Sequence, residues 1–536
     1  MRTLLLFALL LGPLLAGTPG PGSPFTLDVR EDGAPPLAAH AWLRPGGRGL
    51  ILEQTWPSRV ELELVADAQG FLYGEARLAA GVRERLLDEL AGARLQVWLR
   101  ESEGTYAGRW RIVSDARNLR QGHLRLRPSA ERPPSPLAAT IRGAVEPVLD
   151  RSTVPVTSAF SRGRPELEPL VRGRAIFGRM ADLIANAQHE VLFLTYTWEA
   201  DCAPAQRIVD GLRALAERRR QTGGPPVRAY FVVNGGWFAK RTAIKAMRQD
   251  LEGLGLAPFV DVRLVRHKHR LFGALHTKSL VVDGRVAGVT GANPEAKHDG
   301  ETPWYDLGFV VHGQAAWGAR EDFAQVWRKT TGEELPAIPV PPAHPDDVPV
   351  YLIGRKANES PLRRRIDDPQ GQAYLAAIEN ARRSLRILTP NLNYRPLMEA
   401  LVRAAARGVH VQLVLSLGFN KDAENRPLQG GCNETTARWL QSTLFEQQIG
   451  GFELRWYSVD GREPHVGNGP SSSHAKYLTV DGQIALVGST NLDTQSLLHS
   501  RELDFLVDDP ATVHAWDARA FLPVWERAVP AWRFAR

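Results

Sequence analysis

The stretch HTKSLVVDG at residues 276–284 recurs as HAKYLTVDG at residues 474–482. Each copy places a histidine and a lysine two residues apart, followed by four mainly apolar or β-branched residues and then Asp-Gly. Alternation along a strand puts that histidine and that lysine on the same face. Asp-Gly followed by a second apolar run predicts a hairpin. The two stretches therefore predict two equivalent β-hairpins, each of which begins with a His-Lys pair.

The aspartate of each copy is expected to serve the turn. Asp283 lies five residues beyond Lys278, and Asp481 lies five residues beyond Lys476. Five residues of extended chain span roughly 16 Å, at about 3.3 Å per residue. A carboxylate that far along the strand cannot act together with the histidine and the lysine. Asp283 and Asp481 are therefore interpreted as structural residues.

The chain before each hairpin alternates helices and strands in the same order. The expected elements cover residues 175–187, 191–194, 208–215 and 227–233 in the first half, and 374–381, 385–388, 396–408 and 409–415 in the second. Such alternation predicts an α/β fold with a mainly parallel or mixed sheet covered on both faces. The motif histidines are 198 residues apart, which is about one domain length. This period indicates duplication of a whole α/β unit.

Further matches follow each hairpin. Asn293 and Asn491 stand at the same offset from the two motif aspartates. Asp306 and Glu502 introduce strand-like apolar runs, 23 and 21 residues after those aspartates. A lone His-x-Lys pair is close to noise, whereas two copies with matching downstream residues indicate one chemical site.

One half supplies an imidazole, an ammonium, a carboxamide and a carboxylate. Lys278 and Asn293 offer hydrogen-bond donors that suit an anion. His276 is suited to act as a nucleophile or as an acid and base. Asp306 is expected to accept a hydrogen bond from the second nitrogen of His276 and so to select its tautomer. With the set doubled, one histidine can attack phosphorus while the other protonates the leaving oxygen.

With these motifs, the chain resembles the phospholipase D superfamily, whose signature is His-x-Lys-(x)4-Asp followed by Gly-Ser-x-Asn, twice in one chain. The resemblance covers roughly residues 173–536. It implies two α/β/α halves that are packed face to face and share one active site. It also implies phosphodiester chemistry through a phosphohistidine, without a metal or another cofactor.

The resemblance also assigns roles to individual residues. His276 and His474 are the nucleophile and the general acid/base, and symmetry leaves open which is which. Phosphate binding falls to Lys278, Lys476, Asn293 and Asn491, and orientation of the histidines to Asp306 and Glu502.

One departure from the signature lies in the first half, where Thr290-Gly291 replaces Gly-Ser. The hydroxyl of Ser489 in the second half thus has no direct counterpart, and Thr290 supplies the neighbouring hydroxyl. Ser489 and Thr290 are both counted among the expected phosphate-binding residues. Activity is expected because both His-Lys pairs are intact.

Composition is typical of a globular protein of several domains. The 536 residues are 43% hydrophobic and 23% charged. The expected ranges are a signal peptide at 1–20, a β-rich accessory domain at 25–128, a linker at 129–172, a first phospholipase D-like half at 173–332, a Pro-rich linker at 333–350 and a second half at 351–536.

The N-terminus predicts export. Arg2 precedes an apolar core from Leu4 to Leu15, and small residues follow up to Gly20. This core is short for a membrane span, and an uncleaved anchor is the alternative. We therefore expect a protein of the periplasm, the cell envelope or the exterior, with membrane association left open.

The net charge of +7 favours anionic partners, but it does not distinguish phospholipid headgroups from nucleic acid. The only two cysteines, Cys202 and Cys432, do not form a disulfide framework. Two unpaired thiols are expected in preference to a bridge.

Phospholipid is the first expected substrate, with hydrolysis of the headgroup or its transfer to another alcohol, as in cardiolipin synthases. Both motifs lie in one chain, and Trp304-Tyr305-Asp306 resembles the lipid-acting branch of the superfamily. A secreted nuclease of the same superfamily is the alternative. A catalytically silent binding protein is a third hypothesis, which two complete motifs disfavour. A monomer is expected.

Overall fold

The structure, a computed structural model, describes strand segments between residues 23 and 128 and then residues 133–531, apart from residues 236–241, 270, 361 and 364. The chain divides into two compact units, residues 1–140 and 141–536. The signal peptide expected at residues 1–20 lies outside the described residues.

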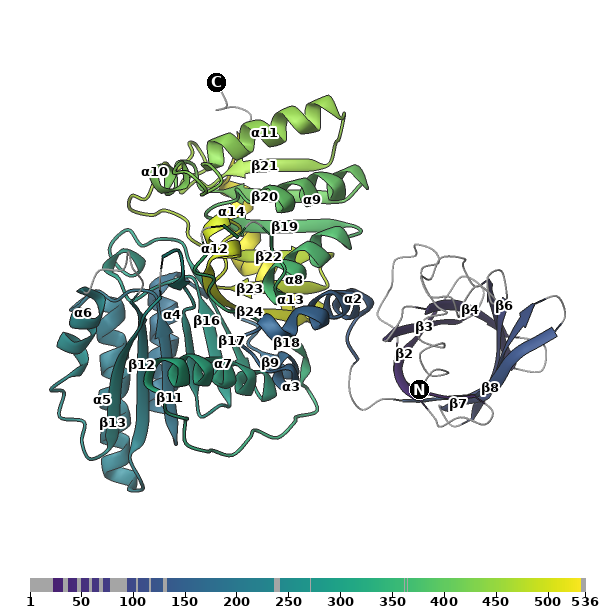
Figure 1. Ribbon diagram of the computed structural model, residues 1–536, viewed down its shortest axis with the longest axis horizontal. Coiled ribbons are helices and arrows are strands. Elements are labelled where there is room, and N and C mark those ends of the chain that lie inside the picture. Colours follow the sequence, from purple (N-terminus) through teal and green to yellow (C-terminus); the bar gives the residue numbers. More distant parts are fainter. Residues whose placement is uncertain are drawn as a thin grey trace. The chain divides into compact units, whose positions relative to one another are not determined.

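The described strands of the first unit form a closed antiparallel barrel (Figure 1). Strands adjacent in sequence pair with each other, and β1 pairs with β8. Val97 and Leu99 are buried while Gln96 and Trp98 are half-buried, as alternation predicts for this β-rich region. The strands are β1 (Ser23–Glu31), β2 (Leu37–Pro45), β3 (Leu50–Trp56), β4 (Val60–Ala66), β5 (Phe71–Arg77), β6 (Arg94–Ser102), β7 (Thr105–Ser114) and β8 (Arg117–Pro128).

The segment expected as a linker at residues 129–172 is largely structured. Its elements are α2 (Pro136–Val145), η2 (Glu146–Arg151), α3 (Val156–Ala159), β9 (Phe160–Pro165) and β10 (Leu170–Val171). Its prolines suggested a linker, but Ala138, Ile141, Val145 and Leu149 recur at helical spacing and are buried. Strand β9 pairs with one strand of each half, so this segment is part of the α/β unit.

The first half of the α/β unit is built on a mixed sheet with the order β10–β17–β16–β15–β11–β12–β13. Strands β11, β12 and β13 are parallel, and the other pairs are antiparallel. All six residues of β11 are buried, as expected for a central strand covered on both faces. The strands are β11 (Glu190–Thr195), β12 (Val227–Asn234), β13 (Val260–His267), β14 (Ala274–Leu275), β15 (Ser279–Val282), β16 (Val286–Thr290) and β17 (Leu307–His312); the helices are α4 (Arg172–Ala185), α5 (Ala203–Thr222), α6 (Thr242–Leu251), η3 (Ala296–His298) and α7 (Gln314–Thr331).

The second half follows the same plan, with the strand order β18–β24–β23–β22–β19–β20–β21–β25. Strands β19, β20 and β21 are parallel, like β11 to β13. The strands are β18 (Val348–Arg355), β19 (Ser384–Thr389), β20 (His410–Leu415), β21 (Phe452–Trp456), β22 (Tyr477–Val480), β23 (Ile484–Gly488), β24 (Ser500–Asp508) and β25 (Val529–Pro530). The helices are α8 (Pro369–Glu379), α9 (Arg395–Ala406), α10 (Lys421–Glu424), α11 (Asn433–Glu446), α12 (Thr494–Leu498), α13 (Pro510–Trp516), η4 (Asp517–Phe521) and α14 (Leu522–Arg527).

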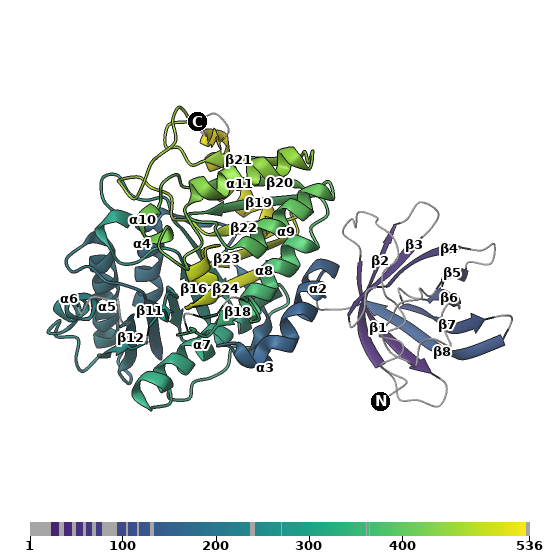
Figure 2. The same cartoon turned by 45° about the horizontal axis from the view of Figure 1, so that its top comes forward.

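The two sheets lie side by side, joined through β9, as the teal and the green-to-yellow parts of the ribbon show in both views (Figures 1 and 2). The predicted α/β fold class is confirmed. Residues 333–347, between α7 and β18, form neither a helix nor a strand.

The two motif hairpins turn at Asp-Gly. Asp283 and Gly284 have φ of 54° and 59°, and Asp481 and Gly482 have φ of 58° and 64°, which is the left-handed geometry of a tight hairpin turn. The Asp283 carboxylate accepts hydrogen bonds from three successive main-chain N–H groups at the start of β11. The Asp481 carboxylate does the same at the start of β19. Both carboxylates therefore tie a hairpin to the neighbouring strand.

Both cysteines are free thiols and are buried. None of the helices in the part of the chain that the structure describes is long and apolar enough to cross a membrane.

Candidate active site

The main chain brings each motif histidine to the acidic segment of the other half. The N–H of His276 donates to the carbonyl of Arg501 at 3.0 Å, and the N–H of His474 donates to the carbonyl of Tyr305 at 2.8 Å. Arg501 and Tyr305 immediately precede the acidic residues of the second and the first half. Strand β14, just before His276, also pairs in parallel with β24. The two hairpins therefore contribute to one site between the halves.

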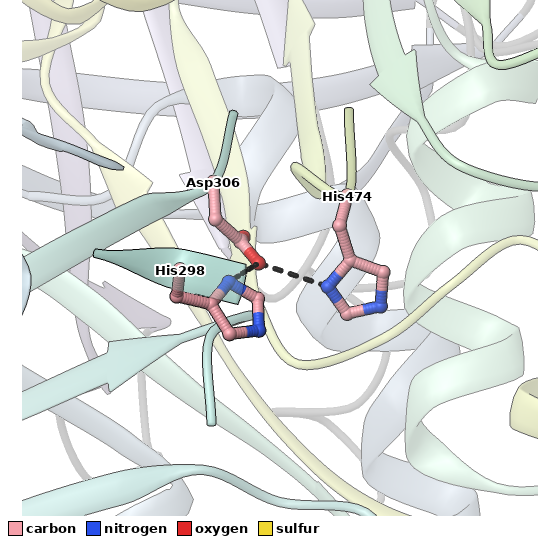
Figure 3. A group of neighbouring side chains, drawn as sticks. All are labelled: His298, Asp306 and His474. Carbon is pink, nitrogen blue, oxygen red and sulfur yellow. Dashed lines mark hydrogen bonds and ion pairs between the residues drawn. The ribbon is translucent and has the colours of Figure 1, made fainter. Parts of the chain in front are cut away.

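The histidines and the carboxylates are paired across the two halves. Nδ1 of His276 lies 2.8 Å from Oε1 of Glu502, and Nδ1 of His474 lies 2.8 Å from Oδ2 of Asp306 (Figure 3). The expectation that Asp306 pairs with His276 is therefore wrong, because the main-chain crossing carries each histidine to the opposite half. A carboxylate at Nδ1 selects the tautomer with a proton on Nδ1 and leaves Nε2 available as a nucleophile or base.

The two motif lysines are buried beside the histidines. Nζ of Lys278 donates to the carbonyl of His276 at 2.6 Å, and Nζ of Lys476 donates to the carbonyl of His474. Burial lowers the pKa of Lys278 to about 7 and that of Lys476 to about 8, although Glu502 and Asp306 oppose this effect. A bound anion would favour the charged form of both lysines. The pair is suited to hold a phosphate group.

The two asparagines differ in how far the protein occupies them. Oδ1 of Asn293 accepts a hydrogen bond from the Thr195 hydroxyl at 3.2 Å, and its amide nitrogen donates to Glu295 at 3.2 Å. Oδ1 of Asn491 is buried and has no hydrogen-bond partner among the described residues. The Asn491 side chain is therefore the more available of the two for a substrate.

Comparisons with known proteins agree with this site. A family model described as "Cardiolipin synthase, PLD-like domain" matches residues 374–525, which include the second motif. The minor cardiolipin synthase ClsB of Bacillus subtilis is 22% identical over 370 residues, which cover 66% of this chain and 79% of ClsB. The chain belongs to the phospholipase D superfamily.

Other relatives of this superfamily member span less of their own length. A cardiolipin synthase of Geobacillus kaustophilus is 24% identical over 355 residues, which cover 64% of this chain and 63% of the relative. Among solved structures, phosphatidylserine synthase of Haemophilus influenzae aligns with a TM-score of 0.47 and 15% identity, over 73% of this chain and 92% of that one.

The departure from the superfamily signature has a steric cause at Gly291. A Cβ at this position would lie 2.3 Å from Oδ1 of Asp306 and 3.0 Å from Nζ of Lys476. Both distances are too short for a side chain unless the site atoms move. Gly291 therefore leaves room for the carboxylate and the ammonium, and a serine like Ser489 does not fit in this arrangement.

Ser489 was expected to bind phosphate, but its hydroxyl is bound within the protein. It donates to Oε2 of Glu502 at 2.6 Å and accepts from the N–H of Leu503 at 3.1 Å. A hydrogen bond to a charged group contributes about 1.5–3 kcal/mol. Ser489 thus supports the carboxylate that holds His276.

Thr290 was also expected near the phosphate, and its hydroxyl serves the main chain instead. It donates to the carbonyl of Leu307 at 2.7 Å and accepts from the N–H of Ala292 at 3.0 Å. In the second half the corresponding loop N–H groups donate to the carboxylate of Asp504. Thr290 therefore does not compensate for the missing serine.

The two catalytic carboxylates have opposite pKa shifts. Burial raises the pKa of Glu502, but His276, Lys278 and Ser489 outweigh that effect, so its pKa lies below the ordinary value. Burial raises the pKa of Asp306 above its ordinary value despite the nearby Lys476. Burial also lowers the pKa of both motif histidines, and so favours neutral rings in the empty site.

Two residues of the site were missed from the sequence. Nδ1 of His298 lies 3.7 Å from Oδ2 of Asp306, the oxygen that His474 uses (Figure 3). In the second half, the Ser496 hydroxyl donates to Oε1 of Glu502. Both residues stand 15 positions after the motif aspartate of their half, so the offset was a usable signal.

His298, Asp306 and His474 also have donor atoms within 4.8 Å of one another. This spacing suits a metal ion. However, Oδ2 of Asp306 already accepts the Nδ1 proton of His474, and the charge of Lys476 acts on the same carboxylate. The chemistry of the group therefore favours a hydrogen-bonded set over a cation site.

Aromatic rings pack around His474. The rings of Trp304 and Phe419 each lie 5.7 Å from the imidazole, measured between centroids. Tyr305 turns away, and its hydroxyl donates to the carbonyl of Ala520 at 2.7 Å. Of the two aromatic residues before Asp306, Trp304 therefore borders the site and Tyr305 is a core residue.

Proposed function

We propose that the protein hydrolyses or transfers the phosphatidyl group of phospholipids through a phosphohistidine intermediate. The observation that carries the proposal is the pair of crossed His–carboxylate hydrogen bonds, each 2.8 Å long, beside two buried lysines. The names of the cardiolipin synthase relatives support a lipid substrate and transfer to an alcohol.

The site provides for a two-step displacement. Nε2 of one motif histidine attacks phosphorus, which forms a P–N bond and breaks the P–O bond to the first alcohol. The other histidine donates a proton to that leaving oxygen. It then takes a proton from water or from a second alcohol, whose oxygen attacks phosphorus and breaks the P–N bond.

The remaining side chains stabilise charge during both steps. Lys278 and Lys476 lie beside the two histidines, where the non-bridging oxygens of a phosphodiester would be held. Glu502 and Asp306 keep the rings oriented and stabilise the imidazolium that forms at the acid/base histidine.

One set of assays tests this function. The purified protein is incubated in EDTA with vesicles of mixed phospholipids and, separately, with single-stranded and duplex DNA. We expect released headgroup, and new phosphatidyl alcohols when ethanol is added. DNA cleavage without lipid turnover would favour the nuclease alternative, and no turnover of either substrate would favour a binding protein. His474→Ala is the matched control for contaminating activity.

We also propose that the enzyme is exported and acts at a membrane as a monomer. The proposal rests on the charged residue, apolar core and small-residue zone of residues 1–20 and on the lipid substrate proposed above. Fractionation of cells and sizing of the purified protein test it. Full-length protein confined to the cytosol, or a stable dimer, would contradict it.

A further inference from the structure

The two halves differ in what supports the carboxylate oxygen that binds the catalytic imidazole. In the second half, Oε1 of Glu502 receives both Nδ1 of His276 and the hydroxyl of Ser496. In the first half, Oδ2 of Asp306 receives Nδ1 of His474, and Nδ1 of His298 faces the same oxygen at 3.7 Å. Ser496 and His298 thus occupy matching places, at the same offset from the motif aspartates.

The lengths of the acids and their partners are complementary. Glutamate is one methylene longer than aspartate, so Glu502 reaches the short side chain of Ser496. Asp306 is shorter, and the longer imidazole of His298 extends toward it (Figure 3). Gly291, where the second half has a serine, leaves no side-chain donor at that position.

The position of His298 is determined by its surroundings. Its main-chain carbonyl would lie 2.3 Å from a Cβ at Gly173, so only a glycine lets helix α4 approach this closely. Its ring packs edge-on against Trp304, with centroids 5.6 Å apart. It is fully buried, and neither ring nitrogen has a hydrogen-bond partner within 3.5 Å among the described residues.

A buried imidazole without a partner is costly unless the site uses it. The charged or titratable groups that face His298 are Asp306, His474, Lys297 and Lys476. Burial holds the pKa of His298 well below its ordinary value, so the ring is neutral and carries one N–H. With that proton on Nδ1, the N–H points at Oδ2 of Asp306.

We propose that His298 is a positioning residue that donates a hydrogen bond from Nδ1 to Oδ2 of Asp306 and thereby holds this carboxylate against His474 during the reaction. The proposal rests on the function proposed above. The 3.7 Å separation closes when His474 becomes an imidazolium and requires a fully ionised partner. His298 does not contact the substrate, so it acts on turnover and not on binding.

Two variants separate the donor from the bulk of the ring. His298→Asn places an amide N–H near the position of Nδ1, whereas His298→Leu fills similar space without a donor. We expect His298→Leu to lower kcat about tenfold, the effect of one lost hydrogen bond to a charged group, with KM unchanged. The acid limb of its kcat profile should move to higher pH, because an unsupported Asp306 protonates more easily. His298→Asn should stay within about threefold of wild type.

A proton NMR measurement reads the same contact without turnover. The Nδ1 protons of His276 and His474 should give two downfield resonances, assigned by their loss in His276→Gln and His474→Gln. His298→Leu should shift the His474 signal alone, and the matched variant Ser496→Ala should shift the His276 signal alone. This result is independent of whether the lipid assay succeeds, so the two proposals can fail separately.

Several outcomes would overturn the role of His298. One is full kcat in His298→Leu. Another is an equal loss of kcat in the Leu and Asn variants, both folded by thermal melting, which would indicate a packing role only. A His474 resonance that His298→Leu leaves unshifted would contradict the contact itself.

Discussion

Glu502 and Asp306 hold matching places in the two halves, and each accepts a hydrogen bond from the histidine of the other half. Their other partners differ. Two hydroxyls, from Ser489 and Ser496, donate to Glu502. Among the described residues, Asp306 accepts instead from the N–H of Leu307, with an imidazole 3.7 Å away. The duplicated scaffold determines where imidazole meets carboxylate, and the two carboxylates are then supported in different ways.

The loops around the carboxylates differ in a compensated manner as well. Gly488 has no room for a side chain, because a Cβ there would lie 2.2 Å from Oδ1 of Asp504. The register of the first sheet puts Gly308 at the place of Asp504 and Thr290 at the place of Gly488. A single substitution copied from one half into the other should therefore fail unless its neighbour changes too.

The largest expected effect is the loss of either motif histidine. His276→Ala and His474→Ala should each reduce turnover by roughly four orders of magnitude or more, because neither half can complete the two-step reaction alone. Turnover of labelled phospholipid measures the loss, and thermal melting checks the fold. Full activity in either variant would show that the halves do not share one site.

Neutralising the carboxylates should have the next largest effect and should test the crossing. Glu502→Gln and Asp306→Asn keep the shape of the side chain but no longer select the tautomer of the paired ring, so we expect losses of roughly 10³-fold or more. In NMR spectra, Glu502→Gln should displace the Nδ1 proton of His276, and Asp306→Asn that of His474. The opposite assignment would contradict the crossed pairing.

A smaller effect should distinguish the two signature loops. Gly291→Ser introduces a Cβ 2.3 Å from the Asp306 carboxylate, so we expect a loss of kcat of roughly 100-fold. Ser489→Gly removes one hydroxyl from Glu502 and should cost about tenfold. Steady-state kinetics of both variants provide the comparison. Equal losses would mean that the halves tolerate exchange and that the steric account is wrong.

The smallest expected effect concerns the lysines and pH. Lys278 and Lys476, with pKa values lowered to about 7 and about 8, are charged below those values and lose the charge as pH rises through them. Sulfate stays a dianion over this range, so its binding should weaken with rising pH. We expect an upshift in Tm of about 2 °C at tenfold saturation at pH 6 and a smaller one at pH 9.

The control for that experiment is Lys278→Met, which should reduce the upshift at pH 6. An upshift of the same size at both pH values would contradict the lowered pKa values.

Much of the fold could be predicted, because the decisive signals are local. Asp-Gly between apolar runs specifies each hairpin turn, and the observed φ values at Asp283 and Asp481 are those of such a turn. Elements of both halves lie close to their predicted ranges, for example β11 at Glu190–Thr195 and β19 at Ser384–Thr389. The segment at residues 133–171 was misjudged, since its prolines obscured a buried helical stripe.

The pairing within the site could not be predicted from the same signals. Asp306 follows His276 by 30 residues and is separated from His474 by 168, so sequence proximity favoured the wrong partner. His298 belongs to no motif, and its neighbour Trp304 attracted attention instead. Both errors concern contacts between segments that only the packed halves bring together.

The central claim is that two histidines, each held by the carboxylate of the opposite half, pass a phosphatidyl group through one covalent P–N bond. Mass spectrometry of enzyme quenched in alkali during turnover of a phospholipid tests it most directly. We predict a phosphatidyl adduct on the peptide that contains His276 or on the one that contains His474, and its absence when that histidine is replaced by alanine. Turnover without an adduct on either peptide, or an adduct on another residue, would contradict the account.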